Sequence, residues 1–303
     1  MKQPCVFIHT NHKQHIGALV SAYSMRRNAR NPDAFDVKLI ELEDHKDVFD
    51  RYEGREYNRD NDTRRWLNDD LQSFTPLRFM PPELMGYEGR AVVVDPDVFA
   101  VGDVGELLDR DMQGKAVMCR TRGTPPHFAS SVMLMDCSKL RHWKLSDDFD
   151  KLFTREREYK TWMNLGYEDK ATIGLLEPEW NDFDKLTPKT KMIHNTRRKT
   201  QPWKSGLPVD FVPAENNAFN PVMLLSRIRR KVFGEYALLG KYKAHPDQRQ
   251  EQLFFSLLKE AVENGFVSKE LLRDHMRDNH VRHDALEVLE RTPPLEQVLP
   301  KAA

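Results

Sequence analysis

The hydrophobic pattern in the first two thirds of the chain predicts an α/β fold. Residues 5–9 are a short apolar run that predicts a first strand, apolar residues recur at helical spacing over residues 16–28, and residues 36–41 alternate as in a second strand. Further strands are predicted at residues 91–94, 115–120, 128–136 and 192–194, with helical segments at 77–85 and over most of 140–165. This β–loop–α–β opening is typical of nucleotide-binding folds, but it lacks a glycine-rich phosphate loop, so phosphates would have to be held in another way.

The last third of the chain has a different pattern. After about residue 216 the apolar residues recur at helical spacing and no further strand is evident. Helices are predicted at residues 223–233, 253–262, 269–275 and 283–290. We therefore expect an α/β domain over residues 1–215 and a helical C-terminal extension over residues 216–303.

The central strand of the predicted sheet ends in two carboxylates. Residues 91–94 are small or β-branched and apolar, as in a strand buried on both faces, and Asp95 and Asp97 follow directly with Pro96 between them. A parallel strand delivers the residues after it to the carboxyl edge of the sheet, where α/β folds bind ligands. Carboxylates there suit Mn²⁺ or Mg²⁺, and such an ion suits a diphosphate. The alternative is that Asp-Pro-Asp is only a turn, which both residue types favour.

Composition narrows the class of protein. The 303 residues contain 39% hydrophobic and 31% charged residues, which is a globular composition. No apolar run approaches the roughly 20 residues of a membrane span, and no secretory signal is evident. Lys+Arg and Asp+Glu are both 47, and a net charge of zero argues against nucleic acid as the main partner. Three cysteines far apart in the sequence predict a reducing compartment, so we expect a cytoplasmic protein.

Histidines occur in two sets. His9, His12 and His15 are three residues apart near the first strand and form a possible metal cluster, although solvated histidines are commoner in such a loop. The histidines of the C-terminal helices match no recognised metal spacing and are expected on the surface: His275, His280 and His283.

Three segments are rich in charge. Residues 44–73 hold several arginines among acidic residues, which predicts a solvated face or a loop beside the ligand. His194 opens a loop with four cations, which would be well placed for phosphates at a sheet edge. The helix predicted at 223–233 is basic and amphipathic, and it either contacts the inner face of a membrane peripherally or is an ordinary solvated helix.

Four sequence blocks resemble glycosyltransferase family 8, which includes glycogenin and bacterial lipopolysaccharide galactosyltransferases. Residues 75–84 resemble an Arg-Leu pair ahead of Pro-Glu, and residues 92–107 resemble an apolar strand followed by Asp-x-Asp and Gly-Asp-Ile/Val-x-Glu-Leu. Residues 128–135 resemble Phe-Asn-Ser/Ala-Gly-Val-Met-Leu, and residues 194–203 resemble His-x-x-Gly-x-x-Lys-Pro-Trp. The blocks occur in the family's order, and the resemblance covers about residues 4–210.

The resemblance implies a GT-A type fold, in which helices flank a central, mostly parallel sheet. It also implies a hexosyltransferase that binds a nucleotide-diphosphate sugar, expected to be uridine-linked, and that acts on a glycan, lipid-linked or protein acceptor with retention of anomeric configuration. Asp95, Asp97 and His194 would bind Mn²⁺ (or Mg²⁺). Whether a covalent intermediate forms or the attack is front-face stays open.

The remaining site residues are also implied by the resemblance. Thr10 and Asn11 would contact the nucleoside, and Arg78 and Lys199 would neutralise the diphosphate. The predicted donor site is completed by Pro96, Ser130 and Ser131. Glu168 or Asp169 would take part in catalysis, the alternative being that both are exposed acids in a helix turn.

The chain departs from the family pattern at four positions. Ala129 stands for the asparagine and Ser131 for the glycine of one block, while Arg197 and Gln201 stand for the glycine and lysine of the last block. The missing cation would come from a neighbouring lysine, Lys199 or Lys204. These changes leave the donor sugar open, and they keep a second function in view, namely a non-catalytic nucleotide-sugar- or glycan-binding protein on the same fold.

Overall fold

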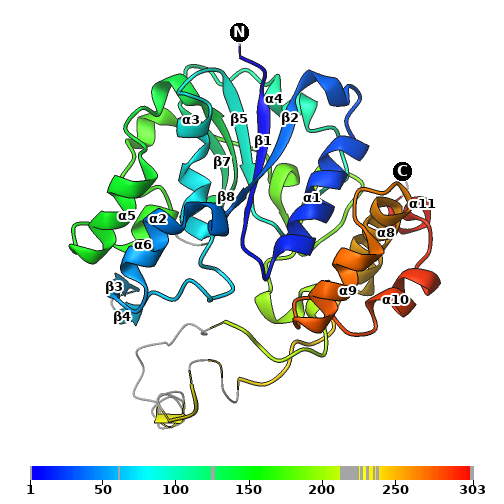
Figure 1. The fold of residues 1–303 in the computed structure, drawn as a ribbon. Helices are drawn as coiled ribbons and strands as arrows, with labels where there is room; N and C mark the ends of the chain where they lie inside the picture. The colour runs from blue at the N-terminus through cyan, green and yellow to red at the C-terminus, as the bar shows by residue number, and fades with distance from the viewer. Residues whose placement is uncertain are drawn as a thin grey trace.

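The structure is a computed structural model that describes residues 2–60, 62–123, 127–211, 225, 228–229, 232–234, 236 and 239–300. Its centre is a six-stranded sheet in the order β2-β1-β5-β8-β7-β9, with helices on both faces (Figure 1). A second sheet has the order β10-β11-β6, and a separate hairpin is formed by β3 and β4. The expected α/β fold with a sheet flanked by helices is confirmed.

The six predicted strands lie within about two residues of their expected bounds, whereas β3, β4, β6, β9 and β10 were not predicted. The strands are β1 (Cys5–Thr10), β2 (Asp36–Glu41), β3 (Glu56–Arg59), β4 (Asp62–Arg65), β5 (Arg90–Val94), β6 (Val98–Ala100), β7 (Val117–Arg122), β8 (His127–Asp136), β9 (Ile173–Leu175), β10 (Asp182–Phe183) and β11 (Met192–His194). The helices are α1 (His15–Arg27), α2 (Lys46–Phe49), α3 (Pro81–Leu84), α4 (Gly105–Leu108), α5 (Leu145–Phe153), α6 (Tyr159–Met163), α8 (Gln248–Glu263), α9 (Lys269–Arg277), α10 (Ala285–Arg291) and α11 (Leu295–Val298).

Most neighbouring strands of the central sheet are parallel. β1 pairs in parallel with both β2 and β5, and β7 pairs in parallel with β9. β8 is the exception, since it runs antiparallel to β5 and to β7. The carboxyl ends of β1 and β5 therefore lie at the same edge of the sheet, which is where Asp95 and Asp97 follow β5.

Strand β5 is held from both sides by hydrophobic side chains. Ala91 and Val93 pack in the hydrophobic cluster that contains side chains of α5. Val92 and Val94 pack in the cluster that contains side chains of α1. All four are fully buried. Burying each valine stabilises the fold by about 1.5–3 kcal/mol, so the end of β5 is a rigid support for the residues that follow it.

Two parts of the α/β domain differ from the expected elements. The helix expected at 77–85 is a 3₁₀ helix, Thr75–Phe79, followed by the short α3. Pro81 and Pro82 begin α3, and because proline has no amide hydrogen a continuous helix is interrupted there. The charged segment 44–73 contains the β3–β4 hairpin, which its mainly polar residues did not indicate.

The C-terminal helices pack against the α/β domain through one hydrophobic cluster. Ile16 and Val20 of α1, Phe99 of β6 and Trp203 pack in the same cluster as residues of α8, α9, α10 and α11. In Figure 1 these helices lie beside α1, on the side away from α5 and α6. α1 therefore has one face on the sheet and another on the C-terminal helices.

The basic helix expected at residues 223–233 lies for the most part outside the described residues. Of its described members, Leu225, Ile228, Val232 and Phe233 are exposed. Among the described residues, no helix is both long enough and apolar enough to cross a membrane.

Candidate functional site

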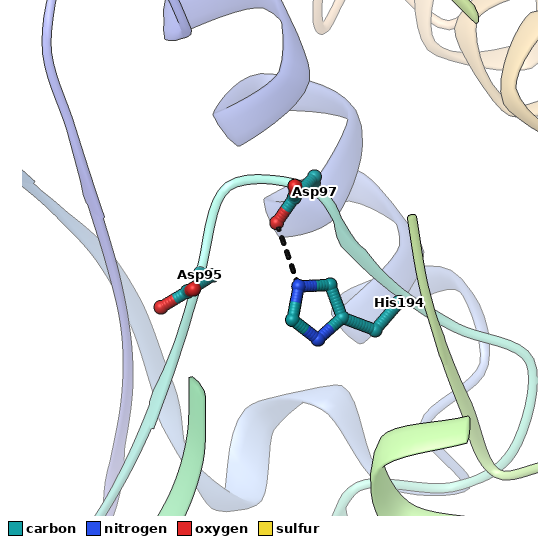
Figure 2. A group of neighbouring side chains, drawn as sticks. All are labelled: Asp95, Asp97 and His194. Carbon is teal, nitrogen blue, oxygen red and sulfur yellow. Dashed lines mark ion pairs between the residues drawn. The ribbon is translucent and has the colours of Figure 1, made fainter. Parts of the chain in front are cut away.

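Asp95, Asp97 and His194, which we call the site triad, converge at the carboxyl edge of the central sheet. One potential ligand atom from each lies within 4.8 Å of the others. The His194 Nε2 atom is 3.2 Å from Asp97 Oδ1. Figure 2 shows the two carboxylates on the turn after β5, with the imidazole reaching toward them from β11.

Strand pairing explains why residues so far apart in sequence meet. β11 pairs antiparallel with β6, and His194 lies opposite Val98, the residue after Asp97. The amide of Asn195 donates a hydrogen bond to the Asp97 carbonyl oxygen at 3.0 Å. The backbone of the small sheet thus fixes the imidazole beside the second carboxylate.

Hydrogen bonds on the side of the ring away from Asp97 orient the imidazole of His194. Its Nδ1 atom is 2.9 Å from the side-chain oxygen of Asn181, and the Asn181 amide nitrogen donates to Ser131 Oγ at 2.9 Å. Because the Asn181 oxygen is an acceptor, Nδ1 carries a hydrogen, and Nε2 is the ring nitrogen that faces Asp97. Such partners fix the tautomer and direction of metal-binding histidines.

Charge in the site triad affects the pKa of His194. Burial of the ring lowers its pKa, but the Asp97 and Asp95 carboxylates outweigh burial, so the pKa is raised above its ordinary value. An ion that binds here would therefore displace a proton from His194.

Asp95 has one cationic and one imidazole partner. Arg78 donates to its Oδ1 at 2.7 Å and to Ser130 Oγ at 2.6 Å, and the His9 Nε2 atom lies 3.0 Å from the same carboxylate oxygen. Burial of the carboxyl raises its pKa, but Arg78 and His9 outweigh burial and hold the pKa well below the usual range. Asp95 is therefore ionised at neutral pH.

The donor set of the triad suits a divalent cation. Two carboxylates and one imidazole are ligands that Mn²⁺ accepts, and carboxylate oxygens also suit Mg²⁺. Asp95 is ionised, and the Nε2 atom of His194 is directed toward Asp97. These residues fit a metal–diphosphate site.

A cavity of about 300 Å³ opens beside the triad. It is lined by predicted site residues and also by three arginines that the sequence pattern did not single out, namely Arg59, Arg122 and Arg198. The only sequence signal for Arg59 was the charge density of segment 44–73, and the signal for Arg198 was the cationic loop after His194. Neither signal indicated which cations face the ligand.

The predicted site residues divide between the cavity and its surroundings. Those that line the cavity are Arg78, Asp95, Asp97, Ser130, Ser131 and His194. Thr10 and Asn11 are buried at the end of β1 and do not line it. The Asn11 amide donates to the Asp70 carbonyl at 3.1 Å, so Asn11 secures the segment around residue 70.

Pro96 supports the turn between the two aspartates. It is buried, and its carbonyl oxygen lies only 3.0 Å from where a Cβ atom on Gly17 would be. The same Cβ would lie 3.0 Å from the Trp203 ring. α1 can approach the turn this closely because residue 17 has no side chain.

The two candidate lysines do not lie where the sequence predicted. Lys199 is exposed and is not part of the cavity wall, whereas its neighbour Arg198 is. Lys204 is fully buried, with its ammonium 2.6 Å from the Asp210 carboxylate. At this point of the loop the structure therefore places Arg198, and not Lys199, in the cavity wall.

Glu168 and Asp169 lie away from the cavity. The Trp143 indole donates to Glu168 at 2.9 Å, and Asp169 caps the turn that precedes β9. β9 begins at the sheet edge where β5 begins, because both align with the same end of β7 and β8, whereas Asp95 follows the other end of β5. The expected catalytic role is not kept for either residue.

The departures from the family pattern have local explanations. Ala129 is buried in the cavity wall. Gln201 lies where the pattern has a lysine, and its amide donates to Asp97 Oδ2 at 3.3 Å while the Gln14 amide donates to Gln201 at 3.0 Å. Gln201 thus links the site triad to the start of α1 without adding charge.

The two sets of histidines meet each other. His9 contacts Asp95, whereas the His12 and His280 rings are 5.1 Å apart and the His15 and His275 rings are stacked at 5.5 Å. The expectation that His275 and His280 lie freely on the surface is corrected, since both are half-buried. The remaining histidine of that set, at position 283, is exposed.

No protein-family model matches the sequence, and no curated protein matches it. The fold is similar to that of several solved structures. The galactosyltransferase LgtC, crystallised with donor and acceptor sugar analogs, has 12% identity and a TM-score of 0.47, with 66% of this chain and 89% of that chain covered. The glycosyltransferase GlyE of Streptococcus pneumoniae TIGR4 has 14% identity and a TM-score of 0.48, with 88% of this chain and 64% of that chain covered. Mouse xyloside xylosyltransferase 1 has 12% identity and a TM-score of 0.45, with 63% of this chain and 97% of that chain covered. These three solved structures are glycosyltransferases.

Proposed function

We propose that the chain is a metal-dependent glycosyltransferase. It moves a hexose from a uridine-diphosphate sugar to a glycan, lipid-linked or protein acceptor, with retention of anomeric configuration. The observation that supports this most directly is the convergence of Asp95, Asp97 and His194 beside a cavity with cationic walls. The sequence blocks that resemble glycosyltransferase family 8 include all three residues.

The chemistry of glycosyl transfer matches this arrangement. Breaking the anomeric C–O bond leaves negative charge on the departing diphosphate, and a divalent ion bound by the triad supplies positive charge at that place. Arg78 holds Asp95 ionised and oriented, and Asn181 holds His194 with Nε2 toward the carboxylates. Arg122 adds a cation at this end of the cavity, where Arg78 and Asp95 both affect its pKa.

A second candidate function is nucleotide-sugar or glycan binding without catalysis. Ala129 motivates it, because this buried wall position is apolar where the family pattern has asparagine. The two functions differ in whether a bound donor is turned over.

Donor binding is tested by thermal unfolding of the full chain with a panel of nucleotide sugars, each with Mn²⁺ and with EDTA. A ligand that binds the folded state raises the apparent stability by mass action. We expect stabilisation by uridine-diphosphate sugars that requires Mn²⁺. If no nucleotide sugar raises the unfolding temperature more with Mn²⁺ than with EDTA, the proposed function is rejected.

Turnover is tested by the slow release of uridine diphosphate with water as acceptor. Release that EDTA stops supports the transferase, whereas Mn²⁺-dependent binding without release from any donor supports the binding protein. Glu168→Gln and Asp169→Asn are controls, since both residues lie at the opposite edge of the sheet. Loss of release in a folded Asp169→Asn variant would return the catalytic role to that segment.

A further inference from the structure

Three arginines lie together at one side of the cavity, and we call them the arginine cluster: Arg59 at the end of β3, Arg64 on β4 and Arg198 in the 3₁₀ turn Arg198–Thr200. Arg59 and Arg198 line the cavity. Burial lowers the pKa of Arg198 and of Arg64, and the charge of Arg59 lowers both further. The three guanidinium groups are therefore close enough to repel one another.

Acidic residues act on the cluster, since Asp60 and Asp62 raise the pKa of Arg64 and Asp70 raises that of Arg59 and of Arg198. Among the described residues, however, no carboxylate lies within ion-pair distance of any of these three guanidinium groups. The Arg59 guanidinium lies over the Tyr159 ring at 4.6 Å. Arg64 Nη2 is buried without a hydrogen-bond partner in the described part of the chain.

Such an arrangement favours an anionic ligand. Like charges that are partly removed from water destabilise one another, and an anion between them relieves the repulsion. The planar fork of a guanidinium matches phosphate and carboxylate oxygens. Two arginines that face one cavity from different elements, with a third behind them, form a site for one such group.

The arginine cluster is distinct from the metal end of the cavity. The pKa of Arg122 is lowered by burial and by Arg78 and is raised by Asp95, which places Arg122 near the site triad. The groups that affect Arg59 and Arg198 are Asp70 and Tyr159 instead. The cavity wall thus carries arginines with different charged neighbours, and of these Arg122 shares its neighbours with the site triad.

The wall that carries Arg59 and Arg64 is fixed in place. Asp60, at the turn of the β3–β4 hairpin, forms an ion pair with Lys160 at 2.6 Å, and its amide donates to Glu158 at 3.0 Å. Both partners belong to the start of α6, so the hairpin is attached to the body of the domain. The cluster is therefore preformed, which lowers the ordering cost of binding.

We propose that the arginine cluster binds a phosphate or carboxylate group of the acceptor, so that the acceptor is an anionic sugar or glycan. This rests on the proposed function, which assigns the metal end to the donor diphosphate. The shared chemistry of the ligand is one anionic group; an alternative source of it would be a carboxylate on the donor sugar, which the experiment distinguishes.

The test is calorimetric titration of the full chain, saturated with Mn²⁺ and uridine diphosphate, with galactose 6-phosphate, glucuronate and galactose. We expect the two anionic sugars to bind more tightly than galactose. Arg59→Gln and Arg198→Gln should each weaken binding of galactose 6-phosphate about tenfold, the size expected for losing a hydrogen bond to a charged group. The affinity for uridine diphosphate should change less than about twofold, since the metal end is intact.

Arg65→Gln is the matched control. Arg65 follows Arg64 on β4 and is exposed, because neighbouring residues of a strand point to opposite faces. It loses the same charge from the same hairpin and should leave all affinities unchanged. Arg59→Lys and Arg198→Lys, which keep the charge but not the fork, should restore part of the binding and guard against misfolding of the glutamine variants.

Three results would overturn the proposal. Equal affinity for galactose and both anionic sugars would show that the cluster selects no anion. An equal loss of affinity for uridine diphosphate in the Arg198→Gln variant would assign the cluster to the donor diphosphate. Tighter binding of uridine-diphosphate glucuronate than of uridine-diphosphate glucose, with the difference lost in that variant, would place the anion on the donor sugar.

The proposed function can fail separately. If uridine diphosphate and Mn²⁺ do not bind, the titrations with galactose 6-phosphate and galactose are repeated on the protein alone. A preference for the phosphate that Arg198→Gln removes would then keep the anion site and reject only its role in glycosyl transfer.

Discussion

Two clusters of histidine and acidic residues lie near the start of α1, and they use histidine in opposite ways. In the site triad, His194 lies between two carboxylates that face a cavity, and its pKa is raised despite burial. In the second cluster, His12, His15, His275 and His280 pack ring against ring between the start of α1 and α9. We call these four residues the histidine interface.

The imidazole rings of the histidine interface differ in charge near neutral pH. Burial lowers the pKa of His275 and of His280 to about 4, so both are neutral near pH 7. Hydrogen bonds to Asp69 and Glu43 raise the pKa of His12 to about 9. Asp69 is also paired with Lys13 at 2.8 Å, so each carboxylate already has a cationic partner.

Histidines and carboxylates that lie close together do not by themselves make a ligand site. Within the described ranges, the residues that bring three ligand atoms together are those of the site triad, not those of the interface. The triad presents three potential ligand atoms to a cavity, whereas the interface consists of packed rings whose acidic partners lie beside Lys13 and His12. A divalent cation should therefore distinguish the two clusters.

The largest expected effect is that of Asp97→Asn. Removing one ligand charge should weaken Mn²⁺-dependent binding of uridine diphosphate by more than about tenfold. Losing only a residue that hydrogen-bonds a metal ligand already weakens metal binding by roughly tenfold or more. The unfolding temperature without metal should change by no more than about 2 °C, since the side chain lies at a cavity edge. Titration of the wild type and of Asp97→Asn with Mn²⁺ in the presence of uridine diphosphate measures this affinity. Equal affinity in the two proteins would remove Asp97 from the metal site.

A somewhat smaller effect is expected for His194→Gln. The amide keeps a polar atom near Asn181 but lacks the imidazole nitrogen, so the affinity for Mn²⁺ with uridine diphosphate should fall about tenfold. His275→Gln, on the histidine interface, is the matched control and should leave this affinity unchanged. If the two variants lose affinity equally, the distinction between the clusters fails.

The pH dependence of stability should come in part from the histidine interface. In the unfolded chain His275 and His280 titrate near 6.5, but in the folded protein near 4, so the unfolded state binds more protons between these values. Their contribution is therefore lost as pH falls from about 6.5 to about 4. His12 has the opposite sign: its stabilisation is complete below about pH 6.5 and is lost as pH rises through about 9.

Thermal unfolding of the metal-free protein across pH measures these contributions. We expect the unfolding temperature to fall by several degrees between pH 7 and pH 4.5, and His275→Gln combined with His280→Gln should reduce that fall. His283→Gln is the control, because this ring is exposed and bonds only to Asn279 among the described residues. An unchanged acid limb in the double variant would show that the interface does not titrate as its packing implies.

The smallest effect is expected for Gly17→Ala, which acts on the helix that joins both clusters. The new methyl group would lie 3.0 Å from the Pro96 carbonyl and from the Trp203 ring, so one of them must shift by a few tenths of an ångström. We expect about a twofold loss of Mn²⁺-dependent nucleotide affinity, since the aspartate turn moves slightly. Arg26→Ala, farther along α1, is the control. Ala18→Gly would not serve, because it removes packing from the hydrophobic core. A tighter-binding Gly17→Ala variant would show that the turn is not positioned by α1.

Local pattern predicted the parts of the fold that depend on one element at a time. The apolar runs placed β1, β2, β5, β8 and β11 within a few residues, because period and burial are properties of a single strand. The same pattern placed Asp95 and Asp97 directly after β5, and thus at the carboxyl edge. The short strands β9 and β10 were not predicted, because so few residues show no period of their own and neither segment was set off as a separate apolar run.

What the sequence determined by itself is which residues follow a buried strand, and this placed Asp95 and Asp97 at the carboxyl edge of the sheet; His194 was added to them by the resemblance to glycosyltransferase family 8. Only the tertiary structure decided which elements became neighbours: it brought Arg59 and Arg198 into one cavity, left Lys199 exposed and moved Glu168 to the far edge of the sheet. The physical reason is that the backbone fixes a side chain's direction locally, whereas its partners are set by long-range packing, which no local pattern encodes.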